Sequence, residues 1–170
     1  MDKTITTALL IVIGMVMAVT LFNVAFPAVQ SSSDAMANMA SRADDRLRTQ
    51  AVIIQASGEL DSDGWWQDSN NNGYFDVFVW VKNVGSVTID PLSSVDVFFG
   101  PEGDFVRIPS DAIAKGSFPN WSSDFENATQ WTPSATLLIT IHYESPLSSG
   151  RYYVKVSLPD GDSVDYFMGL

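Results

Sequence analysis

The sequence ALLIVIGMVMAVTLFNVAFPAV, residues Ala8 to Val29, decides the fold of this chain of 170 residues. It lies within a longer uncharged stretch that runs from Thr4 to Ser33. As a helix, these 22 residues would measure about 33 Å, which exceeds the bilayer hydrocarbon core of about 30 Å. A cleavable signal peptide would have a shorter apolar region and a small-residue cleavage site. We therefore expect a retained helix that can cross a membrane.

The helix is expected to continue beyond this apolar stretch. Residues 30–48 contain no Gly or Pro, and apolar residues recur there at three- and four-residue spacing. Pro27 lacks an amide hydrogen, so we expect it to bend or interrupt the helix near Asn23. Residues 1–50 then form one continuous or once-bent helix that serves as a filament core or a membrane anchor. Its candidate packing residues are Ile5, Leu9, Ile13, Val16, Leu21, Met36 and Met39.

Beyond residue 50 the pattern changes to short runs rich in Val, Ile, Phe, Tyr and Thr, bounded by turn residues. Regularly spaced short strands without a helical pattern between them indicate a sandwich of two sheets. We predict an α+β chain: the long helix, followed over residues 51–170 by an Ig-like antiparallel β-sandwich. The expected strands are Val52–Leu60, Tyr74–Asn83, Ser94–Phe99, Phe105–Ile108, Thr136–Tyr143, Arg151–Leu158 and Ser163–Gly169.

Side chains alternate between the two faces of a strand, so parity predicts which of them form the core. Four tryptophans, Trp65, Trp66, Trp121 and Trp131, fall in turn-rich segments, where we expect them to cover the core rather than bind a ligand. An Asp-Gly pair at residues 160–161 predicts a hairpin between the last two strands. The predicted core residues are Val77, Val79, Val81, Leu137, Ile139, Ile141, Val154, Val156 and Leu158.

The chain is strongly acidic, with a net charge of −11, and it contains no cysteine. Residues 1–48 carry four acidic and four basic residues, so the whole excess of negative charge follows residue 48. Such a surface repels phosphate backbones, which excludes nucleic acid as an expected partner. Without cysteine, disulfides cannot stabilise an exported domain, which must rely on its core, on a metal or on assembly.

The sequence offers little catalytic chemistry. The single histidine, His142, falls on the polar face of an apolar strand, where a structural role is the usual one. A Ser-His-Asp arrangement could use any serine, but no GxSxG, Walker, GxGxxG or HExxH motif is present. We therefore expect neither an enzyme nor an organic cofactor.

The segment DSNNNGYFD, residues 68–76, resembles a calcium-binding loop. It places oxygen-bearing side chains at relative positions 1, 3, 5 and 9 and Gly73 at position 6, as D-x-[DN]-x-[DN]-G loops do. The acid usual at position 12 is missing, and Asp61 or Asp63 could supply it. A plain Asn/Gly-rich loop remains the alternative. The candidate calcium ligands are Asp68, Asn70, Asn72, the Tyr74 carbonyl and Asp76.

Two glycosylation sequons occur close together, Asn120-Trp121-Ser122 and Asn127-Ala128-Thr129. Both fall in a stretch that the sequence pattern assigns to a loop. We therefore predict surface-exposed glycosylation at Asn120 and Asn127.

The N-terminal residues, MDKTITTALLIVIGMVMAVTLFNVAF, resemble the type IV pilin superfamily, and within it archaellin, the filament subunit of the archaeal swimming organelle. Ile5 stands where bacterial pilins carry an acid, and a β-sandwich suits archaellin better than a bacterial pilin head. Archaellins lose a short leader, so Met1 would be either the mature first residue or the translation start. The resemblance implies a helix that resides in the membrane before assembly and a homo-oligomeric helical filament outside the cell.

The interpretation favoured by the sequence is therefore a structural subunit of an extracellular, archaellum-type motility filament. Its sandwich would face outward and carry calcium and glycans. The alternatives are a membrane-anchored stator or accessory protein of the same machine, an adhesive type IV pilin, and a membrane-tethered β domain that binds a surface partner. Copy number distinguishes the first two, because a filament protein is abundant and a stator is scarce.

Overall fold

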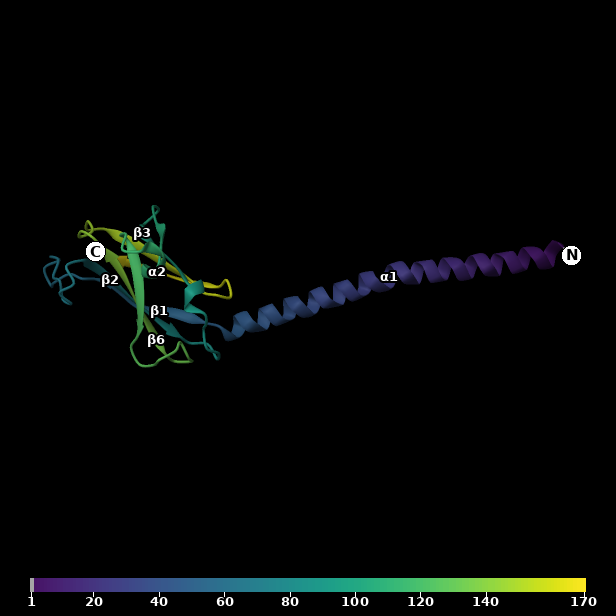
Figure 1. Cartoon of the computed structure of the whole chain (residues 1–170), viewed down its shortest axis with the longest axis horizontal. Coiled ribbons are helices and arrows are strands. Elements are labelled where there is room, and N and C mark those ends of the chain that lie inside the picture. Colours follow the sequence, from purple (N-terminus) through teal and green to yellow (C-terminus); the bar gives the residue numbers. More distant parts are fainter. Residues whose placement is uncertain (1) are drawn as a thin grey trace. The chain divides into compact units, whose positions relative to one another are not determined.

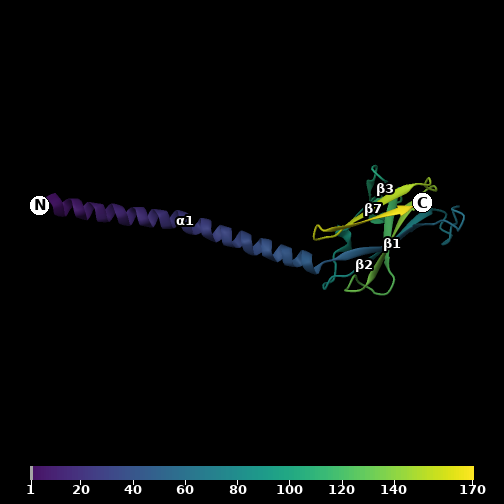
Figure 2. The ribbon, with the colours of Figure 1, turned by 180° about the vertical axis from the view of Figure 1, so that it is seen from behind.

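The computed structural model of the chain describes residues 2–170, together with the side chains of residues 3–44 and 48–170. The chain divides into two compact units, residues 1–44 and residues 45–170. The first is helical, and the second is an all-β unit with two short helical turns. The expected fold class, a long N-terminal helix followed by an antiparallel sandwich, is confirmed (Figures 1 and 2).

Helix α1 spans Asp2–Arg48 and is continuous through Pro27. The expected end near residue 48 is thus confirmed, and the proline does not interrupt the helix. Two threonine hydroxyls within the apolar segment donate to backbone carbonyls one turn earlier, Thr7 to Lys3 at 2.8 Å and Thr20 to Val16 at 2.7 Å. These bonds satisfy hydroxyl groups that would otherwise be costly in an apolar environment.

Eight strands form two four-stranded antiparallel sheets. The first sheet has the order β1-β2-β6-β5 and the second the order β4-β3-β7-β8. A short 3-10 turn, Leu92–Ser94, and the short helix α2, Asp111–Ala114, lie in the connections. The strands are β1 Ala51–Gly58, β2 Phe75–Asn83, β3 Asp96–Pro101, β4 Val106–Ile108, β5 Asn120–Phe125, β6 Thr136–Tyr143, β7 Arg151–Ser157 and β8 Ser163–Gly169.

All seven expected strands are present, and β5 is the one that the sequence pattern missed. Its sequence NWSSDF has four polar residues, and it had been assigned to a loop. β5 lies at the edge of its sheet, where it pairs with β6 and places Trp121 opposite Ile141. An edge strand covers less of the core, so it tolerates polar residues that a central strand does not.

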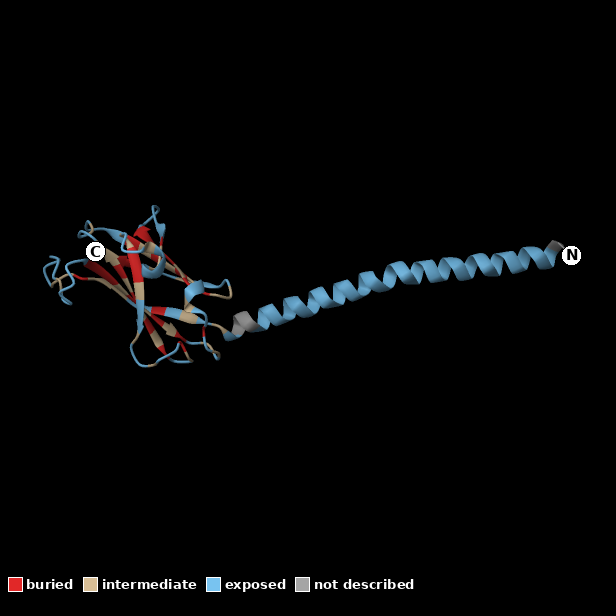
Figure 3. Cartoon of the chain, in the orientation of Figure 1, coloured by how far each residue is buried: buried red, intermediate tan, exposed pale blue. Residues whose placement is uncertain are grey.

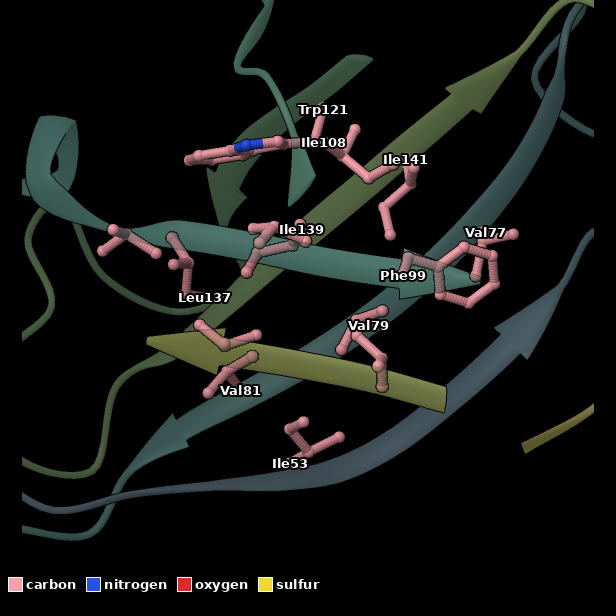
Figure 4. Close-up of a cluster of buried hydrophobic side chains, with 14 of the residues drawn as sticks. Ile53, Val77, Val79, Val81, Phe99, Ile108, Trp121, Leu137, Ile139 and Ile141 are labelled. Carbon is pink, nitrogen blue, oxygen red and sulfur yellow. The ribbon is translucent and has the colours of Figure 1, made fainter. Parts of the chain in front are cut away.

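The core lies between the two sheets, where side chains from β1, β2 and β6 meet those from β3 (Figure 4). Every core residue predicted from strand parity is buried, with an exposed fraction of at most 3%. On the outer face of the first sheet, Phe78 and Trp80 are half-buried, and the Trp80 indole nitrogen donates to Glu126 at 2.9 Å. Alternation along β2 therefore separates a dry inner face from an outer face that keeps polar partners.

The four tryptophans that the sequence pattern assigned to turn-rich segments divide into two pairs. Trp121 and Trp131 are 6% and 1% exposed and form part of the core, so the expectation that they cover it is confirmed. Trp65 and Trp66 are 73% and 40% exposed, so that expectation is wrong for them. They lie in the segment between β1 and β2 and are not among the residues of the core.

The predicted hairpin joins β7 and β8. The N–H of Gly161 donates to the Leu158 carbonyl at 3.0 Å, and Gly161 has φ of 87°, a conformation that glycine adopts without strain. The Asp-Gly pair therefore fixes the register of the last two strands.

Gly85 follows β2 and packs against residues 48–50, which lead into β1. We expect its replacement by alanine to destabilise the sandwich. Its N–H donates to the Gln50 carbonyl at 2.9 Å, and a Cβ would overlap the Arg48 carbonyl oxygen and approach Gln50 N to 2.6 Å. Backbone on both sides cannot move aside, so the loss should be about 1–3 kcal/mol. Thermal unfolding of Gly85→Ala measures it.

Gly169→Ala is the matched control, because a Cβ at Gly169 would meet nothing within 4 Å. Equal melting temperatures for the two variants would show that the contact between residue 85 and the start of β1 does not constrain the fold.

Candidate functional site

The surface of α1 is the largest candidate functional feature of the described residues. Every described side chain from Lys3 to Asp44 is exposed (Figure 3). By length and composition, the segment Lys3–Asp44 is able to cross a membrane. Exposed apolar surface on this scale marks contact with a membrane or with protein. The fold thus leaves an apolar helix for another environment to cover.

The seven packing residues expected from the sequence all lie on this exposed surface. Their exposed fractions run from 44% for Ile13 to 70% for Leu21, Met36 and Met39, and the set also includes Ile5, Leu9 and Val16. Near the middle of α1 a shallow apolar hollow is lined by Val16, Met17, Thr20, Leu21, Val24, Ala25 and Ala28. Small side chains at the edge of such a hollow allow the ridge of a neighbouring helix to approach closely.

The second candidate is the loop between β1 and β2. Within residues 68–74, side-chain oxygens accept hydrogen bonds from backbone N–H groups of the same loop. The Asp68 carboxylate accepts from the N–H groups of Asn72 and Gly73 at 3.2 and 2.9 Å. The side-chain oxygens of Asn70 and Asn72 accept from the N–H groups of Asn72 and Tyr74 at 3.1 and 2.8 Å. Asn71 and Gly73 have φ of 56° and 79°, and these left-handed conformations allow the tight curl.

Asp76, at the end of this loop, is completely buried. One of its carboxylate oxygens accepts from the amide groups of Asn70 and Asn72 at 2.7 and 2.8 Å, and the other contacts His142 Nδ1 at 2.7 Å. Burial alone would raise the pKa of Asp76, but the hydrogen bonds and charge of these partners outweigh it and hold the pKa below its usual value. The carboxylate thus stays ionised and ties the loop to the sheet.

His142 also contacts the Ser122 hydroxyl through Nε2, at 2.9 Å. The order Ser122, His142, Asp76 is the connectivity of a serine-hydrolase triad. A triad nucleophile usually sits on a sharp turn beside backbone N–H groups that stabilise the oxyanion. Ser122 instead lies within β5, and the neighbouring N–H of Trp121 is already bonded to the Pro109 carbonyl at 3.0 Å. The chain of contacts fixes β2, β5 and β6 to one another.

We therefore expect Ser122 not to react with a fluorophosphonate probe, because it lies within a paired strand and not on the sharp turn that presents a triad nucleophile. Mass spectrometry of the folded, full-length chain after incubation with the probe measures this, with Ser122→Ala as the background. A covalent adduct on Ser122 that Ser122→Ala lacks would contradict the prediction and indicate an enzyme.

Within the described residues, no three His, Cys, Asp or Glu side chains are placed together to hold a metal. A metal in the loop would therefore need amide and carbonyl oxygens as well as carboxylates, which is what the calcium pattern supplies. Asp61 is engaged in its own turn, where its carboxylate accepts from the N–H groups of Asp63 and Trp65 at 2.9 and 2.8 Å. The acid expected from Asp61 or Asp63 has a better candidate in Glu59, which sequence spacing did not reveal.

The two sequons lie in different settings. Asn127 is exposed, and its side-chain oxygen accepts from Thr136 N–H at 3.0 Å, so glycosylation there stays a prediction. Asn120 begins β5, is 6% exposed and donates its amide to the Ser117 carbonyl at 2.9 Å. The expectation of a surface loop is therefore wrong for Asn120, because its strand pairs with β6 and buries the side chain.

An aromatic row on the outer face of the second sheet was also missed. Tyr153 lies between Phe105 and Phe167, with ring centroids 4.7 and 5.0 Å away, and the Arg151 guanidinium stands 4.4 Å from the centre of the Phe167 ring. Burial, followed by the nearby charge of Asp165, raises the pKa of Tyr153. The pairing of Tyr153 with Phe167 across β7 and β8 brings these two rings together, and Phe105 joins them from the position just before β4.

Comparison with solved structures finds proteins of similar architecture. The archaellum periplasmic stator protein FlaG from Sulfolobus acidocaldarius matches with a TM-score of 0.54 and 28% identity, over 71% of this chain and 99% of the FlaG chain. This chain is similar to archaellum stator proteins. A chain of the periplasmic stator complex of FlaF and FlaG from the same organism matches with a TM-score of 0.53 and 28% identity, over 71% of this chain and 89% of that one.

No protein-family model and no curated protein matches this chain. The similarity to FlaG supports the archaellum part of the sequence resemblance and does not extend to archaellin. Between the interpretations that the sequence left open, it favours the stator or accessory protein over the filament subunit. It also directs attention to the cell envelope, where the FlaF and FlaG proteins are described as periplasmic.

Proposed function

We propose that this chain is a membrane-anchored component of an archaellum, of the periplasmic stator type. The match to FlaG carries the proposal, because it covers 99% of that chain. It also covers 71% of this chain, about the share that lies beyond α1. The sandwich would be the part that acts in the envelope, and α1 the part that holds it at the membrane.

The chemistry of α1 supports the anchoring role. Its apolar side chains are uncovered in the described structure, and burying apolar surface is worth about 25 cal/mol per Å². Within the helix, backbone N–H and C=O groups satisfy one another, as a membrane-crossing segment requires. Lipid can therefore cover this surface without leaving the backbone groups of the helix unsatisfied.

The length of α1 supports a further role for its second half. The helix contains 47 residues, whereas about 20 suffice to cross a bilayer. Met36 and Met39 lie beyond the most apolar segment and are each 70% exposed. A neighbouring helix would cover this stripe, so we propose a protein partner there in addition to lipid.

A stator needs a partner against which it transmits force. FlaG is described in a complex with FlaF, which is a fact about those proteins. For this chain we propose an envelope protein partner of the sandwich. Since the residues after position 48 carry the whole net charge of −11, a basic or neutral contact surface on that partner would be favoured.

The decisive experiment measures where the native chain resides and how many copies each cell contains. Cells are sheared, filaments are pelleted, and the chain is quantified by mass spectrometry in the filament and membrane fractions. We expect a low copy number in the membrane fraction and a loss of swimming, with filaments still assembled, when the gene is deleted. Dominance of this chain in the sheared filaments would overturn the stator proposal and restore the filament subunit.

A further inference from the structure

The loop between β1 and β2 carries more negative charge than its protein partners neutralise. Glu59 follows β1 directly, and its N–H donates to the Asp76 carbonyl at 2.9 Å. The neighbouring pair Gly58–Val77 faces the core, so Glu59 and Asp76 lie side by side on the outer face. Side chains directly opposite each other across a strand pair have Cβ atoms about 5 Å apart. The two acidic residues are therefore adjacent across this strand pair, beneath the loop.

Both of these carboxyl groups are buried, Glu59 at 4% exposure and Asp76 at 0%. Asp76 has three side-chain partners, including the His142 imidazole. One oxygen of Glu59 accepts from the Ser69 N–H and hydroxyl at 2.6 and 2.5 Å, which aims the carboxyl group at the loop. Its other oxygen, Oε2, is buried and has no hydrogen-bond partner among the described residues. Burying a carboxylate oxygen without a partner costs free energy, and a bound cation in contact with the oxygen would offset that cost.

The ion pairs found among the described residues do not include a basic partner for Glu59. A bound cation would supply the positively charged partner that Glu59 lacks among the described residues. The adjacent ligand pattern specifies which cation, since Asp68, Asn70, Asn72 and the Tyr74 carbonyl offer hard oxygen ligands at alternate positions. Zinc and copper prefer imidazole or thiolate, and this loop offers neither in a cluster.

Asp76 has a positioning role in this arrangement. It accepts hydrogen bonds from the amide nitrogens of both Asn70 and Asn72, so it turns their amide oxygens toward the interior of the loop. Each of those oxygens accepts a single backbone N–H and retains a second lone pair for a cation. The buried network beneath the loop thus orders the ligands that a cation needs.

We propose that residues 68–74, completed by Glu59, bind one calcium ion. Asp68, Asn70, Asn72 and the Tyr74 carbonyl supply oxygens from the loop, and Glu59 supplies the acid that the motif lacks at its twelfth position. Asp76 and His142 hold the loop on the sheet from below. The proposal does not depend on the archaellum function, since it rests on the contacts of this loop.

Isothermal titration of the full-length chain in detergent micelles with calcium chloride tests the site. We expect one calcium per chain and a melting temperature that rises with calcium concentration. Terbium, which replaces calcium in oxygen sites, should give luminescence sensitised by Trp66, and calcium should displace it. An isolated backbone bridge pairs Trp66 with Leu60, the residue that follows Glu59.

Two variants identify the ligands, Glu59→Gln and Asp68→Asn, and each should weaken calcium binding at least tenfold. Asp104→Asn is the matched control, because it removes the same charge from an exposed position in the turn between β3 and β4. Near-ultraviolet circular dichroism establishes that each variant is folded, and Asp68→Asn tests the proposal if Glu59→Gln fails to fold. Absence of calcium heat and of terbium luminescence in the folded wild type would overturn the proposal. An equal loss of affinity in Asp104→Asn would overturn it too, since binding would then reflect general surface charge.

Discussion

Replacement of Val16 with aspartate is expected to abolish retention of the full-length chain in the membrane. Val16 lies near the middle of the apolar segment and is 61% exposed on α1. Placing an aspartate at the centre of a membrane-spanning helix costs about 2.5–3.5 kcal/mol on insertion scales, which corresponds to roughly a hundredfold loss in partition. Extraction of membranes with alkaline carbonate, followed by immunoblotting, measures the retained fraction.

Ser32→Asp is the matched control, because Ser32 follows the apolar segment and is separated from it by Gln30 and Ser31. Ser32→Asp should remain in the membrane fraction, while Val16→Asp should appear in the soluble fraction or be degraded. Full retention of Val16→Asp would mean that protein contacts, rather than lipid, hold α1 in place. The filament interpretation would then regain support.

Replacement of Phe99 with alanine is expected to have the largest effect on the stability of the sandwich. Phe99 is completely buried, with its ring stacked on Tyr152 at a centroid distance of 5.4 Å and tilted against Tyr143 at 6.1 Å. Loss of a buried phenylalanine side chain costs about 3–5 kcal/mol through lost burial and the cavity left behind. Since whole domains are stable by about 5–15 kcal/mol, this is a large part of the total.

Urea unfolding of the full-length chain in micelles, followed by tryptophan fluorescence, measures this loss because Trp121 and Trp131 lie in the core. Phe105→Ala is the control, since Phe105 is 43% exposed and contacts Tyr153 on the outer face. Its expected loss is about 1 kcal/mol. Similar losses for the two variants would show that the space between the sheets is not where the stability resides.

The two units of the chain place different demands on sequence. In α1 the apolar side chains face outward and require lipid or a partner helix, so an added charge acts through the environment of the chain. In the sandwich the apolar side chains face inward and require one another, so a lost side chain acts through packing. The Val16 and Phe99 variants therefore test membrane anchoring and folding separately.

The polar network beneath the loop combines a structural role with the proposed role in calcium binding. Asp76, His142 and Ser122 join three strands of one sheet, and the same Asp76 positions two asparagines of the loop. A triad-like order of residues thus arises here from strand pairing and not from a strand-to-helix turn. Connectivity alone is consequently a weak indicator of catalysis, and the fluorophosphonate experiment addresses it directly.

The local sequence pattern by itself determined the long helix, the two faces of the main strands and the last hairpin. The uncharged stretch around Ala8–Val29 specified the helix, because apolar residues dominate it and none of its residues ends the helix before Arg48. Period-two alternation specified the faces of β2, β6 and β7, since a strand sends successive side chains to opposite sides. The Asp-Gly pair at residues 160–161 specified the last hairpin.

Only the tertiary structure decided how distant residues meet. β5 was missed because its polar sequence matches no strand pattern, and pairing with β6 is what makes it a strand. The partnership of Glu59 with the 68–74 loop, and of Asp76 with His142 across 66 positions, depends on the register between strands. Sequence spacing reports which side of an element a residue occupies. Which other element faces that side is set by strand pairing and burial over the whole sandwich, and those interactions are long-range.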